Sequence, residues 1–342
     1  MAYTTINKPT DYFNTKLYAG NSGTQSITGV GFQPDFLWIK RRTNAGDHNL
    51  VDVIRTSDKT LISNDTGAEY SNNTITSFDS DGFSLSGSDG ALNASSNDYA
   101  SWNWLASNTT ASNTDGSITS TVSANTTSGF SIVSYTGTGA NATVGHGLGS
   151  TPSVVMVKRR NGNSWWYVRH TGTNITDGHV FLNTTSTAST QSTSIIGLSS
   201  STFSLGTEVS VNDSGGTFIA YCFAEKTGYS KFGSYTGNGN ADGTFVYTGF
   251  KPAFVMIKSS SLAEGWWIVD SKRTPNNVVD KLLRPDTNGA ELVGNSNIIL
   301  DILSNGFKLR QTDGALNGSG ASYIYMAFAE EPLVGDNPAT AR

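Results

Sequence analysis

The 342-residue chain repeats one series of four short blocks three times, and this repetition constrains the fold more than any other feature. Each series opens with a Tyr-x-Gly tripeptide and continues with a Pro-containing apolar run ending in Lys, a Phe-x-Leu block and a closing aromatic block. The Lys follows the opening Tyr by 22, 23 and 23 residues in the three copies. The copies are Tyr18–Gly20, Tyr135–Gly137 and Tyr235–Gly237; Gly31–Lys40, Ser150–Lys158 and Gly249–Lys258; Gly82–Leu85, Thr202–Leu205 and Gly306–Leu309; Trp102–Ala106, Tyr221–Glu225 and Tyr325–Glu330.

Four blocks in the same order predict three homologous units, which we place at residues 1–108, 128–226 and 227–342. Each unit has the size of a domain rather than of a solenoid repeat, so we expect each to bury a core of its own. Residues 109–127 are rich in Ser, Thr and Asn and nearly free of apolar side chains, which predicts a linker. The C-terminal tail, residues 331–342, is expected to be extended.

The apolar runs inside a unit are short and rich in β-branched and aromatic residues, as in Phe36–Ile39 and Val154–Val157. Clusters of Gly, Asn, Asp and Ser separate them, a pattern typical of an all-β sandwich. We therefore predict an all-β chain of three tandem antiparallel β-sandwich repeats, jelly-roll-like or immunoglobulin-like. The single cysteine disfavours a true immunoglobulin domain, but the sequence does not separate the topologies further.

Composition excludes several classes of protein. The chain is too poor in charged residues (14%) for a coiled coil, and one cysteine cannot staple a disulfide scaffold. A net charge of -5 argues against nucleic-acid binding. No apolar run reaches the ~18–20 residues of a membrane-spanning helix, and Met1–Asn14 lacks the apolar core of a secretory signal. We expect neither nucleic acid nor membrane among the partners.

No sequence motif points to catalysis. Cys222 lies in the apolar run Phe218–Phe223, where a buried structural thiol is expected rather than a reactive one. The four histidines share no repeat position and no metal-ligand spacing. Neither a Gly-x-Ser-x-Gly elbow nor a phosphate-binding Gly-Lys-Ser/Thr occurs. We expect a non-enzymatic protein with no catalytic residue, no metal site and no cofactor.

Three acidic turns resemble fragments of calcium-binding loops: Asp79–Gly82, Asp89–Asn93 and Asp313–Asn317. A calcium ion needs about six to eight oxygen ligands, whereas one or two carboxylates in a tight turn commonly form the turn itself. We interpret these carboxylates as turn formers, and calcium binding at an Asp-Gly turn stays an open alternative.

The candidate ligand-binding residues are two tryptophan pairs, Trp165-Trp166 and Trp266-Trp267, which we interpret as equivalent in the second and third units. Neighbouring side chains on a strand point to opposite faces, so one Trp of each pair should pack inside and the other outside. Glycan binding by the variants Trp166→Ala and Trp267→Ala would test whether these rings contact a ligand. An exposed Trp suits a sugar ring or a partner surface. The alternative is that a neighbouring unit or subunit covers both rings.

Four stretches carry a resemblance to a known family: Lys8–Tyr18, Gly31–Phe36, Ser131–Gly137 and Tyr325–Glu330. They are similar to repeat-containing proteins of marine tailed bacteriophages, cyanophages included, and the similarity covers almost the whole chain. Members are usually labelled as a domain of unknown function or as a candidate tail-fibre or virion structural protein. The resemblance implies a component of the virion, in a tail appendage or on the capsid surface, and transfers no catalytic residue.

The leading expectation is a virion structural protein in a tail fibre or appendage that contacts a glycan or receptor on the host surface. Repeated copies on a particle would turn weak contacts into avidity. The alternative is a capsid-decorating or capsid-fibre protein. A polysaccharide depolymerase is a third hypothesis, although such enzymes often have short regular repeats rather than domain-sized units. Other virion proteins are the expected partners, and a homo-oligomer, a trimer by analogy, is the expected assembly.

Overall fold

The computed structural model describes residues 4–296, 298–332 and 338–339, and these are built almost entirely from β-strands. Helical structure in these ranges is limited to three short turns: η1 (Pro9–Asp11), η2 (Thr171–Thr173) and α1 (Val209–Asn212). The all-β class predicted from the sequence is therefore confirmed. No helix in the described ranges has the length and apolar character needed to cross a membrane.

The first unit forms a six-stranded and a three-stranded sheet, in which neighbouring strands run antiparallel. The larger sheet has the order β1-β9-β3-β4-β5-β6 and the smaller one β2-β8-β7. The strands are β1 (Phe13–Ala19), β2 (Gln25–Thr28), β3 (Phe36–Arg41), β4 (His48–Asp52), β5 (Thr56–Ile62), β6 (Tyr70–Ser71), β7 (Ile75–Asp79), β8 (Gly82–Leu85) and β9 (Asp98–Trp104).

The second unit forms an eight-stranded sheet, β10-β11-β12-β20-β14-β15-β16-β17, and a three-stranded sheet, β13-β19-β18. The strands are β10 (Ala111–Asn113), β11 (Ser120–Asn125), β12 (Phe130–Thr136), β13 (Ala142–Gly145), β14 (Val154–Arg159), β15 (Tyr167–His170), β16 (Gly178–Phe181), β17 (Ser189–Thr190), β18 (Ile195–Leu198), β19 (Thr202–Leu205) and β20 (Thr217–Phe223).

The prediction of a linker at residues 109–127 is wrong, because this segment contains strands β10 and β11. Strand β11 pairs antiparallel with β12 along its whole length, and β10 pairs with β11 at the edge of the sheet. Strands at a sheet edge can keep one face in solvent, so they need few apolar residues. Here Val122 is buried while its neighbour Thr121 is exposed, which composition alone does not distinguish from a flexible connection.

The third unit forms a four-stranded sheet, β21-β27-β23-β24, and a three-stranded sheet, β22-β26-β25. The strands are β21 (Ser230–Thr236), β22 (Phe245–Tyr247), β23 (Phe250–Ser259), β24 (Trp266–Asp270), β25 (Leu300–Leu303), β26 (Gly306–Leu309) and β27 (Ser322–Pro332). Of the tail expected to be extended, residues 331 and 332 belong to β27, and residues 333–337 and 340–342 lie outside the described residues.

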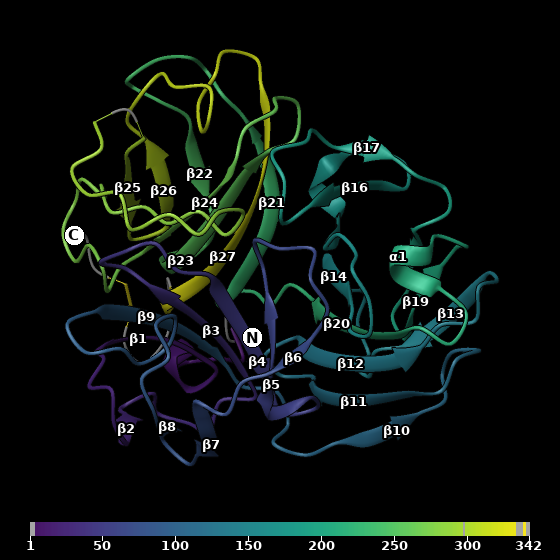
Figure 1. Cartoon of the computed structure of the whole chain (residues 1–342). Helices are drawn as coiled ribbons and strands as arrows, with labels where there is room; N and C mark the ends of the chain where they lie inside the picture. The colour runs from purple at the N-terminus through teal and green to yellow at the C-terminus, as the bar shows by residue number, and fades with distance from the viewer. Residues whose placement is uncertain (1–3, 297, 333–337, 340–342) are drawn as a thin grey trace.

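One strand order recurs in all three units. The four-strand sets β1-β9-β3-β4, β12-β20-β14-β15 and β21-β27-β23-β24 are accompanied by the three-strand sets β2-β8-β7, β13-β19-β18 and β22-β26-β25. The four sequence blocks fall on equivalent strands of these sets. Figure 1 shows the units as three lobes, the first at the lower left, the second at the right and the third at the upper left.

The Tyr-x-Gly block marks a close approach between two backbone segments. In the second unit, the hydroxyl of Tyr135 donates to Val211 O at 2.7 Å, and its ring stacks on Phe218. A Cβ added to Gly137 would lie 2.3 Å from Asp213 O, so only glycine fits there. The same close approach is found at Gly20 (2.2 Å) and Gly237 (2.3 Å).

Each unit buries a hydrophobic cluster between its larger and smaller sheets. Representative members are Leu37 and Phe83 in the first unit, Val155 and Phe203 in the second, and Val255 and Phe307 in the third.

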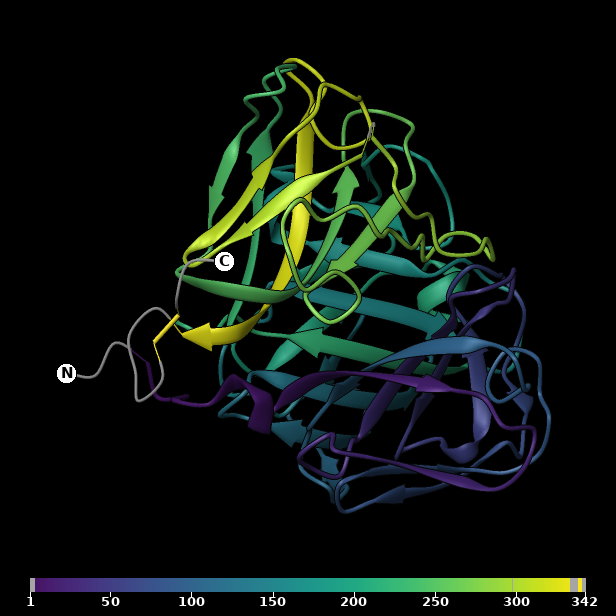
Figure 2. The ribbon, with the colours of Figure 1, turned by 90° about the vertical axis from the view of Figure 1, so that its left-hand side faces the viewer.

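A fourth cluster, which we call the central core, lies where the three larger sheets meet. Its ring contacts join every pair of units: Phe36 to Tyr221 at 4.3 Å, Trp104 to Phe254 at 5.9 Å, and Phe223 to Phe328 at 5.8 Å between ring centroids. Figure 2 shows the larger sheets of the units turned toward one another. The central core also holds five of the seven tryptophans, Trp38, Trp102, Trp104, Trp166 and Trp266.

The central core explains why the apolar runs are continuous rather than alternating. In β14, Val155 faces the cluster of the second unit while its neighbour Met156 faces the central core. Both faces of the strand are therefore buried, one inside the unit and the other between units. The sequence pattern correctly predicts two covered faces, but the second cover comes from the neighbouring units.

Candidate functional site

The candidate site begins with the tryptophan pairs, whose register differs from the sequence interpretation. Strand pairing places Trp266 opposite Lys258. In the second unit Val157 lies opposite Tyr167, so the residue preceding Tyr167, Trp166, stands beside Lys158. Trp166 is thus equivalent to Trp266, whereas Trp165 has no Trp counterpart. A slip of one residue moves a side chain to the other face of a sheet.

The corrected register decides which rings reach solvent. Trp166 and Trp266 are buried in the central core, and Trp267 is buried in the cluster of the third unit with the guanidinium of Arg284 over its ring. Trp165 is 47% exposed. The prediction of one outward ring per pair is therefore wrong for the third unit. Of the four candidates, only Trp165 presents a ring to an external ligand.

Trp165 belongs to an aromatic group on the face of the larger sheet that points away from the central core, where Tyr167 and Phe181 pack in the cluster of the second unit. Its ring centroid lies 4.9 Å from that of Phe181, which in turn contacts Tyr167 at 4.8 Å and His179 at 4.9 Å. We call Trp165, Tyr167, His179 and Phe181 the aromatic patch. Tyr167 and His179 are buried and Phe181 is half-buried, so Trp165 forms the exposed end of the patch.

Polar groups lie inside the aromatic patch. The hydroxyl of Tyr167 donates to Gln191 Oε1 at 3.1 Å, and Nε2 of His179 lies 3.3 Å from the hydroxyl of Ser189. Burial raises the pKa of Tyr167 to about 12 and lowers the pKa of His179 below its usual value, so both groups are neutral at pH 7. These polar groups are buried, so the exposed indole of Trp165 is the part of the patch that a sugar ring could reach.

The remaining conspicuous residues join the units to one another. The lysine of the repeated block is fully buried in every unit, and burial lowers the pKa of each to about 8. Each Nζ donates to a backbone carbonyl of another unit: Lys40 to Asn288 at 3.3 Å, Lys158 to Thr66 at 2.7 Å and Lys258 to Thr185 at 3.3 Å. The first unit thus contacts the third, the second contacts the first, and the third contacts the second.

The indoles beside these lysines make the same kind of contact. Trp166 Nε1 donates to Ile62 O of the first unit, and Trp266 Nε1 donates to Phe181 O of the second, both at 2.8 Å. His48 occupies the equivalent place in the first unit, opposite Lys40. Trp166 and Trp266 therefore hold neighbouring units together, whereas Trp267 packs inside the third unit.

Strands β4, β15 and β24, which follow the lysines, end in Asp52, His170 and Asp270. Each of these residues contacts the unit that the lysine of its own unit does not contact. Asp52 accepts from the Tyr221 hydroxyl at 2.7 Å, and Asp270 accepts from Trp102 Nε1 at 3.1 Å. His170, in the equivalent place of the second unit, lies with Nε2 3.1 Å from Tyr325 O. These contacts run from the first unit to the second, from the second to the third and from the third to the first, so the ring of units is closed.

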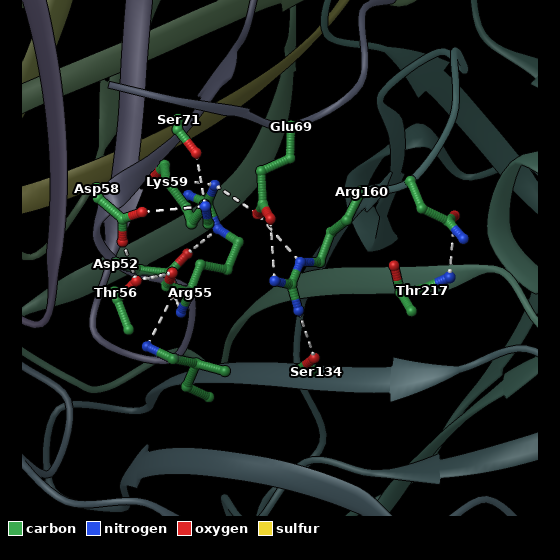
Figure 3. A network of polar contacts seen from close by, with 12 residues as sticks. Asp52, Arg55, Thr56, Asp58, Lys59, Glu69, Ser71, Ser134, Arg160 and Thr217 are labelled. Atoms are coloured by element: carbon green, nitrogen blue, oxygen red, sulfur yellow. Dashed lines mark hydrogen bonds and ion pairs between the residues drawn. The ribbon is translucent and has the colours of Figure 1, made fainter. Parts of the chain in front are cut away.

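Buried arginines complete two of the three boundaries, and Figure 3 shows the one between the first and second units. Arg55 pairs with Asp52 at 2.6 Å and with Glu69 at 3.3 Å, and Glu69 also binds Arg160 of the second unit at 3.0 Å. The nearby charges raise the pKa of Arg55, so its charge is permanent. Its guanidinium also donates to the Tyr221 hydroxyl at 3.1 Å.

An equivalent set lies between the third and first units. Arg273 pairs with Asp270 and with Glu291 at 2.9 Å, and Glu291 pairs with Arg42 of the first unit at 2.8 Å. The backbone N–H groups of Glu69 and Glu291 also donate to Arg160 O and Arg42 O, each at 2.8 Å. At the remaining boundary the equivalent bond runs from Ala188 N–H to Ser260 O, and neither of these two residues has a charged side chain to form the ion pair.

The other predicted candidates have structural roles. Cys222 is buried, and burial raises the pKa of its thiol well above the usual value, as the sequence predicts for an inert thiol. The carboxylates of Asp89 and Asp313 accept the backbone N–H of Ala91 and Ala315, which is the turn-forming role. Among the described residues, no group of three or more His, Cys, Asp or Glu side chains comes together as a metal ion would require.

Sequence reasoning missed the boundary residues, although their spacing is regular. In every unit the lysine is followed after 8 residues by His48, Trp166 or Trp266, and after 12 residues by Asp52, His170 or Asp270. Aligning the units on the lysine would have placed Trp166 with Trp266. It would also have revealed Asp52 and Asp270, each followed three residues later by Arg.

Comparison with known proteins gives one match. A family model described as "Domain of unknown function (DUF7483)" matches residues 8–332. No curated protein and no solved structure matches the chain.

Proposed function

The chain belongs to the family described as Domain of unknown function (DUF7483), and we propose that it is a non-enzymatic virion structural protein, part of a tail fibre or appendage that contacts the host surface. The observation that carries the proposal is the closed ring of three units around the central core. The buried polar groups at the boundaries are used to hold the units together, and the exposed aromatic side chains remain for contact with a ligand.

We also propose that each unit is a β-sandwich of one common, jelly-roll-like type, repeated in tandem. The recurring strand order and the separate cluster between the two sheets of each unit support this interpretation. A virion appendage benefits from such a construction, because rigid β-modules present loops and faces in a fixed geometry. The closed ring offers three related faces to a partner with threefold symmetry, such as a trimeric fibre.

The aromatic patch is the surface that we assign to host contact. Trp165 provides an exposed apolar ring packed on Phe181, a flat surface that suits the apolar face of a sugar ring. A shallow site of this kind would bind each glycan weakly, and several copies on one particle would supply avidity.

The experiment compares glycan-array and host-cell binding of the wild-type chain, Trp165→Ala and Trp165→Tyr. We expect Trp165→Ala to abolish binding and Trp165→Tyr, which retains an aromatic ring, to preserve much of it. Tyr70→Ala is a matched control, because Tyr70 is also exposed but belongs to the first unit. Equal binding by the wild-type chain and Trp165→Ala would remove the aromatic patch as the contact surface.

A capsid-decorating role is the second candidate, and the closed ring is the observation that favours it. A molecule with approximate threefold symmetry suits a local threefold position on a capsid lattice. Gold labelling of intact particles by electron microscopy separates the two: label at the tail supports the appendage, and label over the whole head supports decoration.

A further inference from the structure

The smaller sheets of the three units end in equivalent edge strands, β2, β13 and β22. Their equivalence follows from pairing: Ile27, Val144 and Val246 each lie opposite the Phe of the Phe-x-Leu block of their unit. An edge strand offers unpaired backbone N–H and C=O groups to any extended segment that approaches it. The three edges differ in what lies against them.

In the second unit, residues 116–118 lie along β13, and we call them the strap. Ile118 forms a parallel bridge with Val144, and its N–H donates to Thr143 O at 3.0 Å. The N–H of Ser117 donates to Thr143 Oγ1 at 2.9 Å. The side chain of Ile118 is buried in the cluster of this unit, and Val144 beneath it is fully buried. The strap thus supplies both backbone pairing and an aliphatic side chain.

Among the residues that the structure describes, no segment pairs with β22 as the strap pairs with β13. The chain passes from β20 to β21 through the six residues 224–229, so no segment like 109–127 precedes the third unit. In the described ranges, β22 has a strand partner on one side only, β26. Val246 keeps 5% exposure, compared with 0% for the equivalent Val144.

The side chains on β22 are also unlike those of an edge kept apart from other strands. Phe245 and Tyr247 are 43% and 52% exposed. In the first unit the equivalent residues of β2 are Ser26 and Thr28, whose small polar side chains offer little apolar contact to an added strand. Exposed aromatic side chains on β22 instead give apolar contact to an added strand.

The charges around β22 are paired with each other. Lys308 binds Asp242 at 2.8 Å, and Arg310 binds Asp301 at 3.3 Å. These paired charges do not favour a strongly charged partner at this sheet. Backbone pairing and apolar contact remain as the means of recognition.

We propose that the free edge of β22 binds an extended segment of a partner protein, which adds as a parallel strand and places a β-branched aliphatic side chain over Val246. The strap on β13 supplies the template for this arrangement. Main-chain hydrogen bonds then provide affinity, and the aliphatic side chain provides specificity. This inference does not depend on glycan contact at Trp165, which lies in another unit.

The test uses a labelled peptide with the sequence of residues 113–122, which contains the strap, added to the full chain. We expect saturable binding in fluorescence anisotropy and slower hydrogen exchange in residues 244–248. The variant Tyr247→Lys places a charge on the edge and should weaken binding at least about tenfold. Thr28→Lys, at the equivalent position of the first unit, is the matched control and should leave binding unchanged.

Three outcomes would overturn the proposal. The first is no saturable binding, and the second is binding that Thr28→Lys weakens as much as Tyr247→Lys. The third comes from sedimentation velocity without peptide: a dimer of the wild-type chain that Tyr247→Lys dissociates would assign the edge to a second copy of this chain. Circular dichroism of both variants checks that they remain folded.

Discussion

At the scale of single residues, the repeated blocks mark positions where one side chain meets a strict geometric demand. The glycine of the Tyr-x-Gly block is the sharpest case, because a Cβ at Gly137 would overlap Asp213 O. We expect Gly137→Ala to lower the free energy of unfolding by roughly 1–3 kcal/mol, the usual cost of forcing extra atoms into a packed site. Chemical denaturation measures the change.

Gly289→Ala is the control for this substitution. The nearest atom to an added Cβ at Gly289 is Thr287 Oγ1 at 3.7 Å, and the residue lies outside the left-handed region. Its unfolding free energy should stay within about 0.5 kcal/mol of the wild-type value. Equal losses in both variants would contradict the account of the Tyr-x-Gly block.

His170 makes the boundary between the second and third units sensitive to acid. The N–H of Gly172 donates to Nδ1 at 2.9 Å, so the neutral ring carries its proton on Nε2 and donates to Tyr325 O. Burial lowers the pKa of His170 from 6.5 to about 4. As pH falls, the unfolded chain takes up this proton first, so the stability that neutral His170 contributes is lost between pH 6.5 and pH 4.

This shift corresponds to about 3 kcal/mol of unfolding free energy across the window. We expect the wild-type chain to lose more stability between pH 7 and pH 4 than His170→Gln, in which the group at this position does not titrate. Urea denaturation of both proteins at several pH values measures the difference. Parallel pH profiles would show that His170 does not carry this effect.

At the scale of strands, the register of β15 determines which of the two preceding residues, Trp165 and Trp166, is buried. Trp166 fills the central core, so Trp166→Ala should cost about 3–5 kcal/mol of unfolding free energy. Trp165 is its exposed neighbour, and Trp165→Ala should stay within about 1 kcal/mol of the wild-type value. Thermal and urea unfolding of the two variants compare adjacent residues on opposite faces, and the reverse order of stabilities would mean that the register is wrong.

Short-range patterns in the sequence were sufficient to predict an all-β chain with short antiparallel strands. The apolar run Val154–Val157 predicts a strand with two covered faces, and β14 has them. The pattern could not tell what covers the second face, because an apolar surface packs equally well on its own unit or on another. The prediction of a linker at residues 109–127 was wrong for a related reason, because β10 and β11 form backbone hydrogen bonds that need no apolar side chains.

The candidate site was predicted only in part, because exposure depends on tertiary contacts. Trp165 and Trp166 are indistinguishable in composition, and the strand register separates them. The inward role of Trp266 requires the backbone carbonyl of Phe181, which belongs to another unit and lies 85 residues away in the sequence. Local patterns carry no information about such a partner.

At the scale of the whole molecule, the units are joined more tightly than three domains on a chain. Each unit has its own cluster, but the larger sheets also share the central core. One ring of that core, Phe328, contacts Phe13 of the first unit and Phe223 of the second. Polar contacts at all three boundaries close the ring, those of the repeated lysines in one sense and those at the ends of the following strands in the opposite sense. A unit removed from the ring would expose the apolar face of its larger sheet, so we expect the three units to fold and unfold together.

Differential scanning calorimetry of the full chain, with Phe328→Ala beside it, tests this expectation most directly. A single transition is predicted, with equal calorimetric and van't Hoff enthalpies, and Phe328→Ala should move the whole transition to lower temperature. Two or three resolved transitions, with only one of them shifted by Phe328→Ala, would contradict the claim that the central core unites the units.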